Sequence, residues 1–389
     1  MVAKKQHISI LIPDGGSYEA LKVIRCLGQV PEITTHLLVN SKKVLARYSR
    51  YCDKYHVQRI NISDEKSSIE IIKKVAKENN IDLILPASPS YSELISKYRV
   101  TVSEVAAVPI LPKEEIYRIA LDKWLFYKFC QENKLPVIPS VLAIENKKLA
   151  VNNTVLESFD YPALLKPVFG MGGKGITKIN NSSEMFGIIN DKEKLNGDDK
   201  YLLQNYMSGQ DYCLGVCCQN GKIVAIALQK SLYEPDNFFG PQKAIEYIHD
   251  DRIYELGKKV VSLLGWEGVA FIDFRIDKRD NSIKLLEVNP RFGRGLLGAL
   301  HAGINFPYIW SLLSLSMEYK GKREGSGKYV YPSFYMSMLK DKLMFKKVPV
   351  KAGFSETGLG LLLSDPVPDI LNSMYKLKFR FSNTHKTHN

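Results

Sequence analysis

The stretch Lys284-Leu-Leu-Glu-Val-Asn-Pro-Arg-Phe-Gly-Arg-Gly295 decides the fold of this chain, because its first half can pair as a strand with the segment that precedes it. Val269–Asp277 has apolar side chains at every even-numbered position, as a half-buried strand does. Ile283–Asn289 is typical of a second strand, and the polar residues between the two are centred on Asp280. The sequence therefore predicts an antiparallel hairpin.

Two acidic residues face each other in this hairpin. Symmetric pairing places Asp273 opposite Glu287, and Asn289 projects from the same face. Like charges in opposite positions destabilise a sheet by up to about 1 kcal/mol unless a cation bridges them. Carboxylate and amide oxygens suit Mg²⁺ or Mn²⁺, so these three residues are candidate metal ligands. Three arginines stand nearby and favour an anionic ligand on the metal: Arg275, Arg291 and Arg294.

Bulk properties limit the class of protein. The 389 residues suggest two or three domains or lobes, and the hydrophobic fraction of 45% is ordinary for a globular protein. No apolar run approaches the roughly 20 residues of a membrane span, and the N-terminus has no secretory pattern. Six cysteines show no CxxC pair, which favours reduced core thiols and a cytoplasmic protein.

The net charge of +13 has several interpretations. Basic residues are spread along the chain, so we do not expect a nucleic-acid partner. They are densest in Lys340–Lys351 and Lys376–Arg380. These clusters predict either a solvated face or attraction to a polyanionic substrate or an acidic membrane. Peripheral membrane contact is left open, and so is a homodimer.

The first hundred residues alternate strands and helices and predict a small parallel sheet. Expected strands are His7–Ile12, His36–Val39, Val57–Ile60 and Leu83–Pro86, and expected helices are Tyr18–Leu27 and Ile69–Glu78. The turn at Gly15 and Gly16 either lends N–H groups to an anion or is an ordinary tight turn.

A second region begins near Lys113 with helices at Glu114–Ala120 and Asp122–Glu132. The expected strand Tyr161–Lys166 leads into the glycine-rich connector Pro167–Gly175. This connector lacks the helix and hydroxyl of a Walker loop. It suits a flap over phosphates with Lys166 at its base, and a glycine hairpin without a ligand is the alternative. Ser182 is expected to cap a helix that follows.

The third region contains a hairpin at Asn220-Gly221, a pair typical of a type I′ turn. Closure by two residues predicts Cys213 opposite Leu228 and Cys217 opposite Val224, so these cysteines are expected in the core. The same register predicts Asp211 opposite Lys230. A helix is expected at Asp250–Leu264, before the acidic hairpin.

The ordered set of motifs resembles the ATP-grasp superfamily, in particular the carbamoyl-phosphate synthase large subunit-like and carboxylate–amine ligase branch. The motifs are Asp122-Lys123, Leu164–Pro167, Gly170–Gly175, Leu203–Asp211, Phe271–Asp273 and Leu286–Arg291. The resemblance implies an α/β chain with a Rossmann-like pre-ATP-grasp domain at 1–111. It implies an ATP-grasp domain of two lobes at 112–320, the small lobe at about 140–205 and the large lobe at about 206–320. Residues 321–389 are a basic C-terminal extension outside the resemblance.

The resemblance also implies roles for matching residues. Lys123 and Lys166 would contact nucleotide phosphates, and Asp211 would bind the ribose. The flap and adenine contacts would be Gly170, Met171, Gly172, Gly173, Gln204, Asn205 and Tyr206. The metal ligands would be Asp273, Glu287 and Asn289. Arg291 would steady the transferred phosphate, and Arg294 and Arg275 would contact the acceptor carboxylate. Asn205 departs from the family, which usually has glutamate there.

The function implied is an ATP-dependent carboxylate–amine or carboxylate–thiol ligase. It would use Mg²⁺, pass through an acyl phosphate, and act on small-molecule carboxylate and amine substrates. Phosphorylation of bicarbonate or carbamate is one alternative, and a non-catalytic ATP-binding regulatory protein is another. The acceptor pocket is expected between the Gly15-Gly16 turn, the loop Phe238–Lys243 and Arg294.

Overall fold

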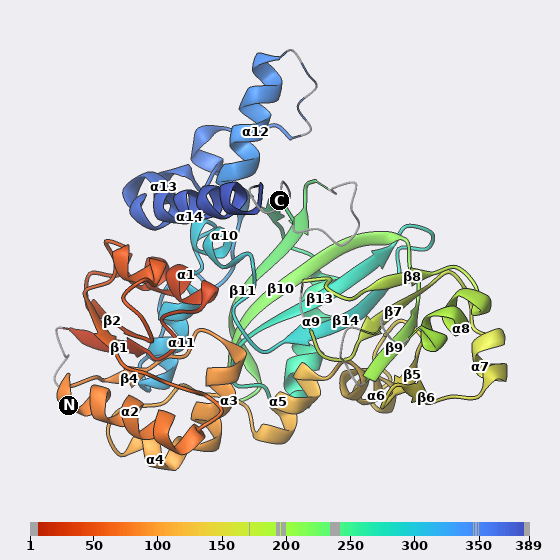
Figure 1. Cartoon of the computed structure of the whole chain (residues 1–389), viewed down its shortest axis with the longest axis horizontal. Coiled ribbons are helices and arrows are strands. Elements are labelled where there is room, and N and C mark those ends of the chain that lie inside the picture. The colour runs from red at the N-terminus through yellow and green to blue at the C-terminus, as the bar shows by residue number, and fades with distance from the viewer. Residues whose placement is uncertain are drawn as a thin grey trace.

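The structure of the protein is a computed structural model (Figure 1). It describes residues 7–384, with the exception of 171, 192–194, 196–199, 234–241, 345, 347 and 349. Within these ranges the chain forms one parallel sheet followed by two antiparallel sheets. The parallel sheet lies at one end of the molecule in Figure 1, the small antiparallel sheet lies at the other, and the large sheet lies between them. This is the α/β architecture that the sequence predicts.

The parallel sheet has the strand order β3-β2-β1-β4. Its strands are β1 (Ile8–Ile12), β2 (Ile33–Val39), β3 (Lys54–Val57) and β4 (Leu83–Ile84). Its helices are α1 (Tyr18–Leu27), α2 (Glu65–Glu78), α3 (Pro89–Lys97) and α4 (Arg99–Ser103). The prediction of β3 at Val57–Ile60 is wrong. The side-chain amide of Asn40 bonds both the N–H and the carbonyl of Ile60, so Ile60 does not join the ladder.

The small antiparallel sheet has the order β6-β5-β9-β7-β8. Its strands are β5 (Ser140–Glu145), β6 (Lys148–Leu149), β7 (Ala163–Pro167), β8 (Thr177–Ile179) and β9 (Lys200–Asn205). Helices α5 (Glu114–Leu121) and α6 (Lys123–Glu132) precede it, and α7 (Asn153–Glu157) and α8 (Ser182–Asn190) belong to it. The cap of α8 is Asn181 rather than Ser182, because the Asn181 amide oxygen accepts the N–H of Glu184 at 3.0 Å.

The large antiparallel sheet has the order β14-β13-β10-β11-β12-β15. Its strands are β10 (Gly209–Gln219), β11 (Lys222–Ser231), β12 (Ala244–Tyr247), β13 (Gly268–Asp277), β14 (Ile283–Asn289) and β15 (Gly327–Val330). Helix α9 (Asp251–Leu264) packs on β10 and β11, while α11 (Phe306–Ser314) packs on β10 and β13. Helix α10 (Leu296–His301) packs against β15. Each face of the sheet carries its own apolar core.

The two hairpins of this sheet differ in how well the sequence predicts them. The predicted pairing of Asp273 with Glu287 is confirmed, but a bulge between Asp273 and Phe274 puts the pairs nearer the turn, such as Ile276 with Ile283, one residue away from symmetric pairing. Asn220 and Gly221 both have positive φ, as a type I′ turn requires, but the predicted register beyond them is wrong. A bulge at Cys217/Cys218 shifts the pairing by one residue. Cys213 therefore pairs with Gln229, Cys217 with Ala225, and Lys230 with Tyr212 instead of Asp211. Cys213 and Cys217 are nevertheless buried, as expected.

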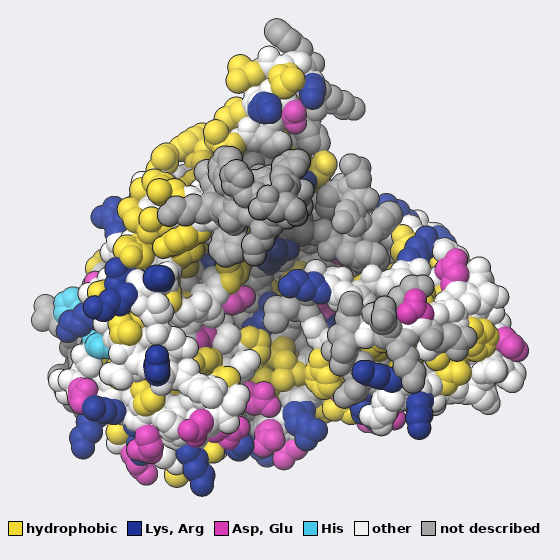
Figure 2. Space-filling view, in the orientation of Figure 1, with side chains coloured by type: hydrophobic (Ala, Val, Ile, Leu, Met, Phe, Trp, Pro, Cys, Tyr) yellow, Lys and Arg dark blue, Asp and Glu magenta, His cyan; other side chains and the backbone are white. Residues whose placement is uncertain are grey.

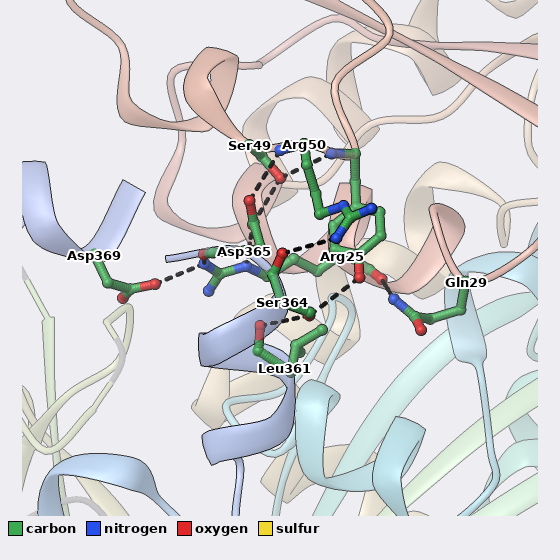
Figure 3. Close-up of polar contacts among 9 residues, drawn as sticks. Arg25, Gln29, Ser49, Arg50, Leu361, Ser364, Asp365 and Asp369 are labelled. Atoms are coloured by element: carbon green, nitrogen blue, oxygen red, sulfur yellow. Dashed lines mark hydrogen bonds and ion pairs between the residues drawn. The ribbon is translucent and has the colours of Figure 1, made fainter. Parts of the chain in front are cut away.

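The C-terminal helices return to the first sheet. They are α12 (Pro332–Leu343), α13 (Leu359–Ser364) and α14 (Val367–Thr384). Figure 3 shows the contact: Arg25 of α1 donates from Nε to Asp365 Oδ2 at 2.8 Å and from Nη2 to Asp369 Oδ2 at 2.6 Å. Asp365 also accepts from Ser49 Oγ at 2.7 Å and from the N–H of Arg50 at 2.9 Å. This Arg25–Asp365 cluster joins the end of the described chain to its beginning. Among the described helices, none is both long enough and apolar enough to cross a bilayer.

Candidate active site

A cavity of about 610 Å³ is lined by residues from the two antiparallel sheets, from α6 and from α1. Figure 2 looks onto the hollow between the parallel sheet and the small sheet, where basic and acidic side chains lie close together. The lining includes nearly every residue for which the sequence predicts a role: Lys123, Lys166, Gly170, Gly172, Gly173, Gln204, Asn205, Tyr206, Asp211, Asp273, Arg275, Glu287, Asn289, Arg291 and Arg294. Met171 lies outside the described residues.

The acidic pair is at the centre of this cavity. The Asn289 amide donates to Asp273 Oδ2 at 3.0 Å and to Glu287 Oε1 at 3.2 Å, so the three side chains form one group. Burial, and then the charge of Glu287, raise the pKa of Asp273. Although burial acts in the opposite direction, Lys123 and Asn289 hold the pKa of Glu287 below its usual value. Ionising both acids at once therefore costs free energy unless a cation binds between them.

Two lysines approach the acids from the small-sheet side. Lys123, the first residue of α6, lies 3.2 Å from Glu287 Oε2 and donates to the carbonyl of Gly170 at 3.0 Å. Asp122 positions it by capping α6 through the N–H groups of the next residues. Lys166 of β7 donates to Gln204 Oε1 at 2.7 Å, and burial lowers its pKa to about 8. Both ammonium groups thus face the cavity close to the acids.

The segment after β9 forms another wall. Gln204 is buried and donates to Ser140 Oγ at 3.1 Å, which fixes the amide that holds Lys166. The Asn205 side chain donates to Asp160, both to its carbonyl at 3.1 Å and to its carboxylate at 3.0 Å. Tyr206 donates its N–H to Pro162 O at 2.9 Å, and Lys178 lies over its ring.

Asp211 has a different partner from the predicted Lys230. Its β10 position pairs with Arg275 of β13, and Arg275 Nε lies 2.8 Å from Asp211 Oδ1. Arg275 also donates to the carbonyl of Met207 at 3.1 Å. The Arg275 guanidinium is therefore fixed by Asp211 and by the carbonyl of Met207, and in turn it orients the Asp211 carboxylate.

The glycine-rich connector between β7 and β8 follows Lys166. Gly170, Gly172 and Gly173 have φ values of 136°, 68° and 75°, which side chains with a Cβ rarely adopt. A Cβ on Gly170 or Gly172 would meet no atom within 4 Å. The glycines are therefore needed for backbone conformation rather than for space.

Arg291 and Arg294 lie beyond the acids, toward α1. Arg291 donates to Asn289 Oδ1 at 3.1 Å and to Phe292 O at 3.2 Å. The hydroxyl of Tyr331 donates to the carbonyl of Arg294 at 3.1 Å. The cavity lining does not include Gly15 or Gly16, and the N–H of Gly15 bonds Leu38 O instead. In the loop Phe238–Lys243, residues 238–241 lie outside the described residues.

The sequence interpretation missed one group of lining residues: Tyr18, Glu19, Lys22, Gln229 and Tyr331. Helix α1 was predicted with its observed bounds, but its polar face gave no indication of where it would point. That direction follows from packing of α1 against α10 and α11, nearly 300 residues later in the chain.

Comparison with known proteins shows similarity over the segments that line this cavity. The family model of the ATP-grasp domain matches residues 120–295. The D-aspartate ligase of Enterococcus faecium (strain Aus0004) is 25% identical over 257 residues. That alignment spans 61% of this chain and 61% of the ligase, less than two thirds of its length.

Solved structures share the fold at low sequence identity. N5-carboxyaminoimidazole synthetase from Staphylococcus aureus, in complex with ADP, has a TM-score of 0.65 and 16% identity and covers 88% of this chain and 87% of its own. The biotin carboxylase domain dimer of Hydrogenobacter thermophilus 2-oxoglutarate carboxylase, in complex with MgADP, ADP and bicarbonate, has a TM-score of 0.65 and 17% identity. It covers 84% of this chain and 74% of its own.

Proposed function

Since this chain belongs to the ATP-grasp superfamily, we propose that it is an ATP-dependent ligase that joins a carboxylate to an amine, or to a thiol, through an acyl phosphate. The observation that carries the proposal is the pairing of Asp273 with Glu287 in a cavity that also holds Lys123 and Lys166. A protein that only binds a nucleotide has no need of two acids in this arrangement. The relationship to D-aspartate ligase supports ligation over other uses of ATP.

The residues present fit a divalent cation. Asp273, Glu287 and Asn289 offer the hard oxygen donors that Mg²⁺ prefers. In the structure Lys123 and the Asn289 NH₂ group balance the two acids. A half-turn of the Asn289 amide exchanges its nitrogen and oxygen and adds an oxygen ligand. When bound, the ion would neutralise charge on the nucleotide phosphates.

The chain's own groups would position the reactants. Lys123, Lys166 and the connector amides are placed to bind phosphate oxygens, and the buried Gln204 keeps Lys166 aimed into the cavity. Asp211, held by Arg275, is placed to accept hydrogen bonds from ribose hydroxyls. We therefore assign Arg275 to the nucleotide end and Arg291 to the reacting phosphate.

The proposed reaction has two steps. A carboxylate oxygen of the acceptor attacks the γ-phosphorus, the bond to the ADP oxygen breaks, and an acyl phosphate forms. The amine nitrogen then attacks the acyl carbon, loses a proton, and inorganic phosphate leaves with the carbon–oxygen bond pair. Arg291, between Asn289 and the α1 end, is placed to stabilise negative charge in both steps.

Trapping with hydroxylamine tests the proposal without knowledge of the amine. The chain is incubated with ATP, Mg²⁺, hydroxylamine and a panel of carboxylic acids, and ADP and hydroxamate are measured. We expect both products in equal amounts with at least one acid. Glu287→Gln should lower the rate by about a hundredfold or more, because it removes one charged ligand worth about 3 kcal/mol in the transition state.

Glu255→Gln is the matched control, since Glu255 is an exposed acid of α9 outside the cavity. A Glu287→Gln rate within twofold of the unmodified rate would refute the assignment. ADP release with bicarbonate and ammonia alone would identify the carbamoyl-phosphate type of reaction. Nucleotide binding without turnover across the panel would identify a regulatory protein.

A further inference from the structure

The end of the cavity next to α1 has an excess of positive charge. Lys22 of α1 lines it together with Arg291 and Arg294. Lys22 is only 9% exposed, although lysine is among the residues least often buried. Both arginines are close enough to act on its charge. Three cations and one carboxylate, that of Glu19, thus share this end of the cavity.

Lys22 has no oxygen partner within hydrogen-bond or ion-pair distance among the residues that the structure describes. Its Nζ lies 4.3 Å from the centre of the Tyr18 ring, which supplies no lone pair for a hydrogen bond. Burial, opposed by Glu19 and assisted by Arg294 and Arg291, lowers the pKa of Lys22 to about 8. The group therefore remains protonated at neutral pH, and its unused donors are available to a ligand in the cavity.

The acidic pair does not neutralise this end. Glu287 is paired with Lys123, and both acids accept hydrogen bonds from the Asn289 amide. Arg291 is itself held by Asn289 and by a main-chain carbonyl. The Arg294 side chain is exposed at the cavity, and Tyr331 fixes only its main chain. Among the described residues at this end of the cavity, Lys22 and Arg294 are thus the cations whose side chains have no oxygen partner.

We propose that Lys22 and Arg294 form a subsite for a second anionic group of the acceptor, in addition to the carboxylate that is phosphorylated. The subsite rests on the proposed function, because it names the acceptor as a small acid with two anionic ends. One end reaches Arg291 and the reacting phosphate, and the other pairs with the buried ammonium. An acid with a methyl group in place of the second anion would displace water from that ammonium without supplying an acceptor.

Three amino acids of similar shape test the subsite in the hydroxylamine assay, each as both enantiomers: aspartate, O-phosphoserine and 2-aminobutyrate. The first two carry a carboxylate or a phosphate where the third has a methyl group, so they also identify the anion. We expect kcat/KM to favour one of the dianions. Lys22→Gln should lower its preference over 2-aminobutyrate about ten- to hundredfold, mainly through KM. Lys22→Arg should restore most of the preference.

Lys66→Gln, an exposed lysine of α2, is the matched control and should keep the preference of the unmodified chain. The same acids are titrated calorimetrically with MgADP present, so that binding is measured without turnover. Efficient ligation of 2-aminobutyrate with no preference for a dianion overturns the subsite and leaves the proposed function intact. If aspartate or O-phosphoserine binds in a way that depends on Lys22 but is not ligated, the proposed function is overturned and the subsite stands. Dianion binding that Lys22→Gln does not weaken also overturns the subsite.

Discussion

Replacing Asp365 by alanine should release α13 and α14 from the first sheet. The Asp365 side chain is 1% exposed and that of Arg25 is 7% exposed, so water does not compensate for the loss. Asp365 accepts from Arg25, Ser49 and the N–H of Arg50 through its carboxylate. Removing one partner of a buried ion pair costs about 3–5 kcal/mol, because the other charge stays buried. Asp369 remains as a partner for Arg25, which favours the lower end of that range.

Hydrogen exchange measured by mass spectrometry separates local release from global unfolding. We expect peptides of α13, α14 and Leu45–Tyr48 to exchange about a hundredfold faster in Asp365→Ala, because 3 kcal/mol corresponds to about that factor. Peptides of β13 and β14 should be unchanged. Asp369→Ala is the control: its side chain is 40% exposed and makes one contact with Arg25, so the effect should be within tenfold. Equal exchange in Asp365→Ala and the unmodified chain would refute the reasoning.

Three further predictions use other parts of the molecule. Gly268→Ala should destabilise the fold by about 2 kcal/mol or more in urea unfolding, since Gly268 has a φ of 78° and a Cβ would lie 2.5 Å from Ile110 O; an unchanged midpoint would contradict this. Hydrogen bonds to Glu324 and Asp251 raise the pKa of His249 to about 8. The ion pairs of His249 with these two acids are therefore fully formed below about pH 6.5 and are lost as pH rises through 8. NMR titration of His249 should show this pKa, and Glu324→Gln should lower it. Gln204→Leu should weaken MgATP binding about tenfold in calorimetry, because it removes the acceptor that orients Lys166, whereas Gln131→Leu on α6 should not.

The acidic hairpin could be predicted from the sequence because its information is local. Alternation of polar and apolar residues indicated that Asp273 and Glu287 share a face of neighbouring strands. Their direct pairing also depends on a bulge between Asp273 and Phe274, because the pairs nearer the turn, such as Ile276 with Ile283, are one residue away from symmetric pairing. The neighbouring hairpin also has its predicted turn. Its register could not be derived, because a bulge between two cysteines leaves no trace in the alternation of polar and apolar residues. The shift pairs Lys230 with Tyr212, and the ion-pair partner of Asp211 is Arg275 on β13, the other neighbour of β10.

The α1 wall of the cavity and the C-terminal helices depend on contacts between distant residues. The bounds of α1 were predictable from its pattern, but the direction of Lys22 depends on helices far along the chain. The basic composition of residues 321–389 predicted a solvated or anion-attracting face. It did not predict that Asp365 and Asp369 turn inward onto Arg25, because that ion pair joins residues 340 positions apart.

Lys22 and Arg25 lie less than one helical turn apart on α1. Lys22 lines the cavity, whereas Arg25 forms ion pairs with Asp365 and Asp369 near the C-terminus. None of the described residues after Tyr331 lines the cavity. Removing the residues from Asp365 onward would nonetheless leave the Arg25 guanidinium buried without its two carboxylate partners, on the helix that also carries Lys22. A version truncated before Asp365 would therefore disturb α1, which forms one wall of the cavity, although the removed residues lie outside the cavity lining.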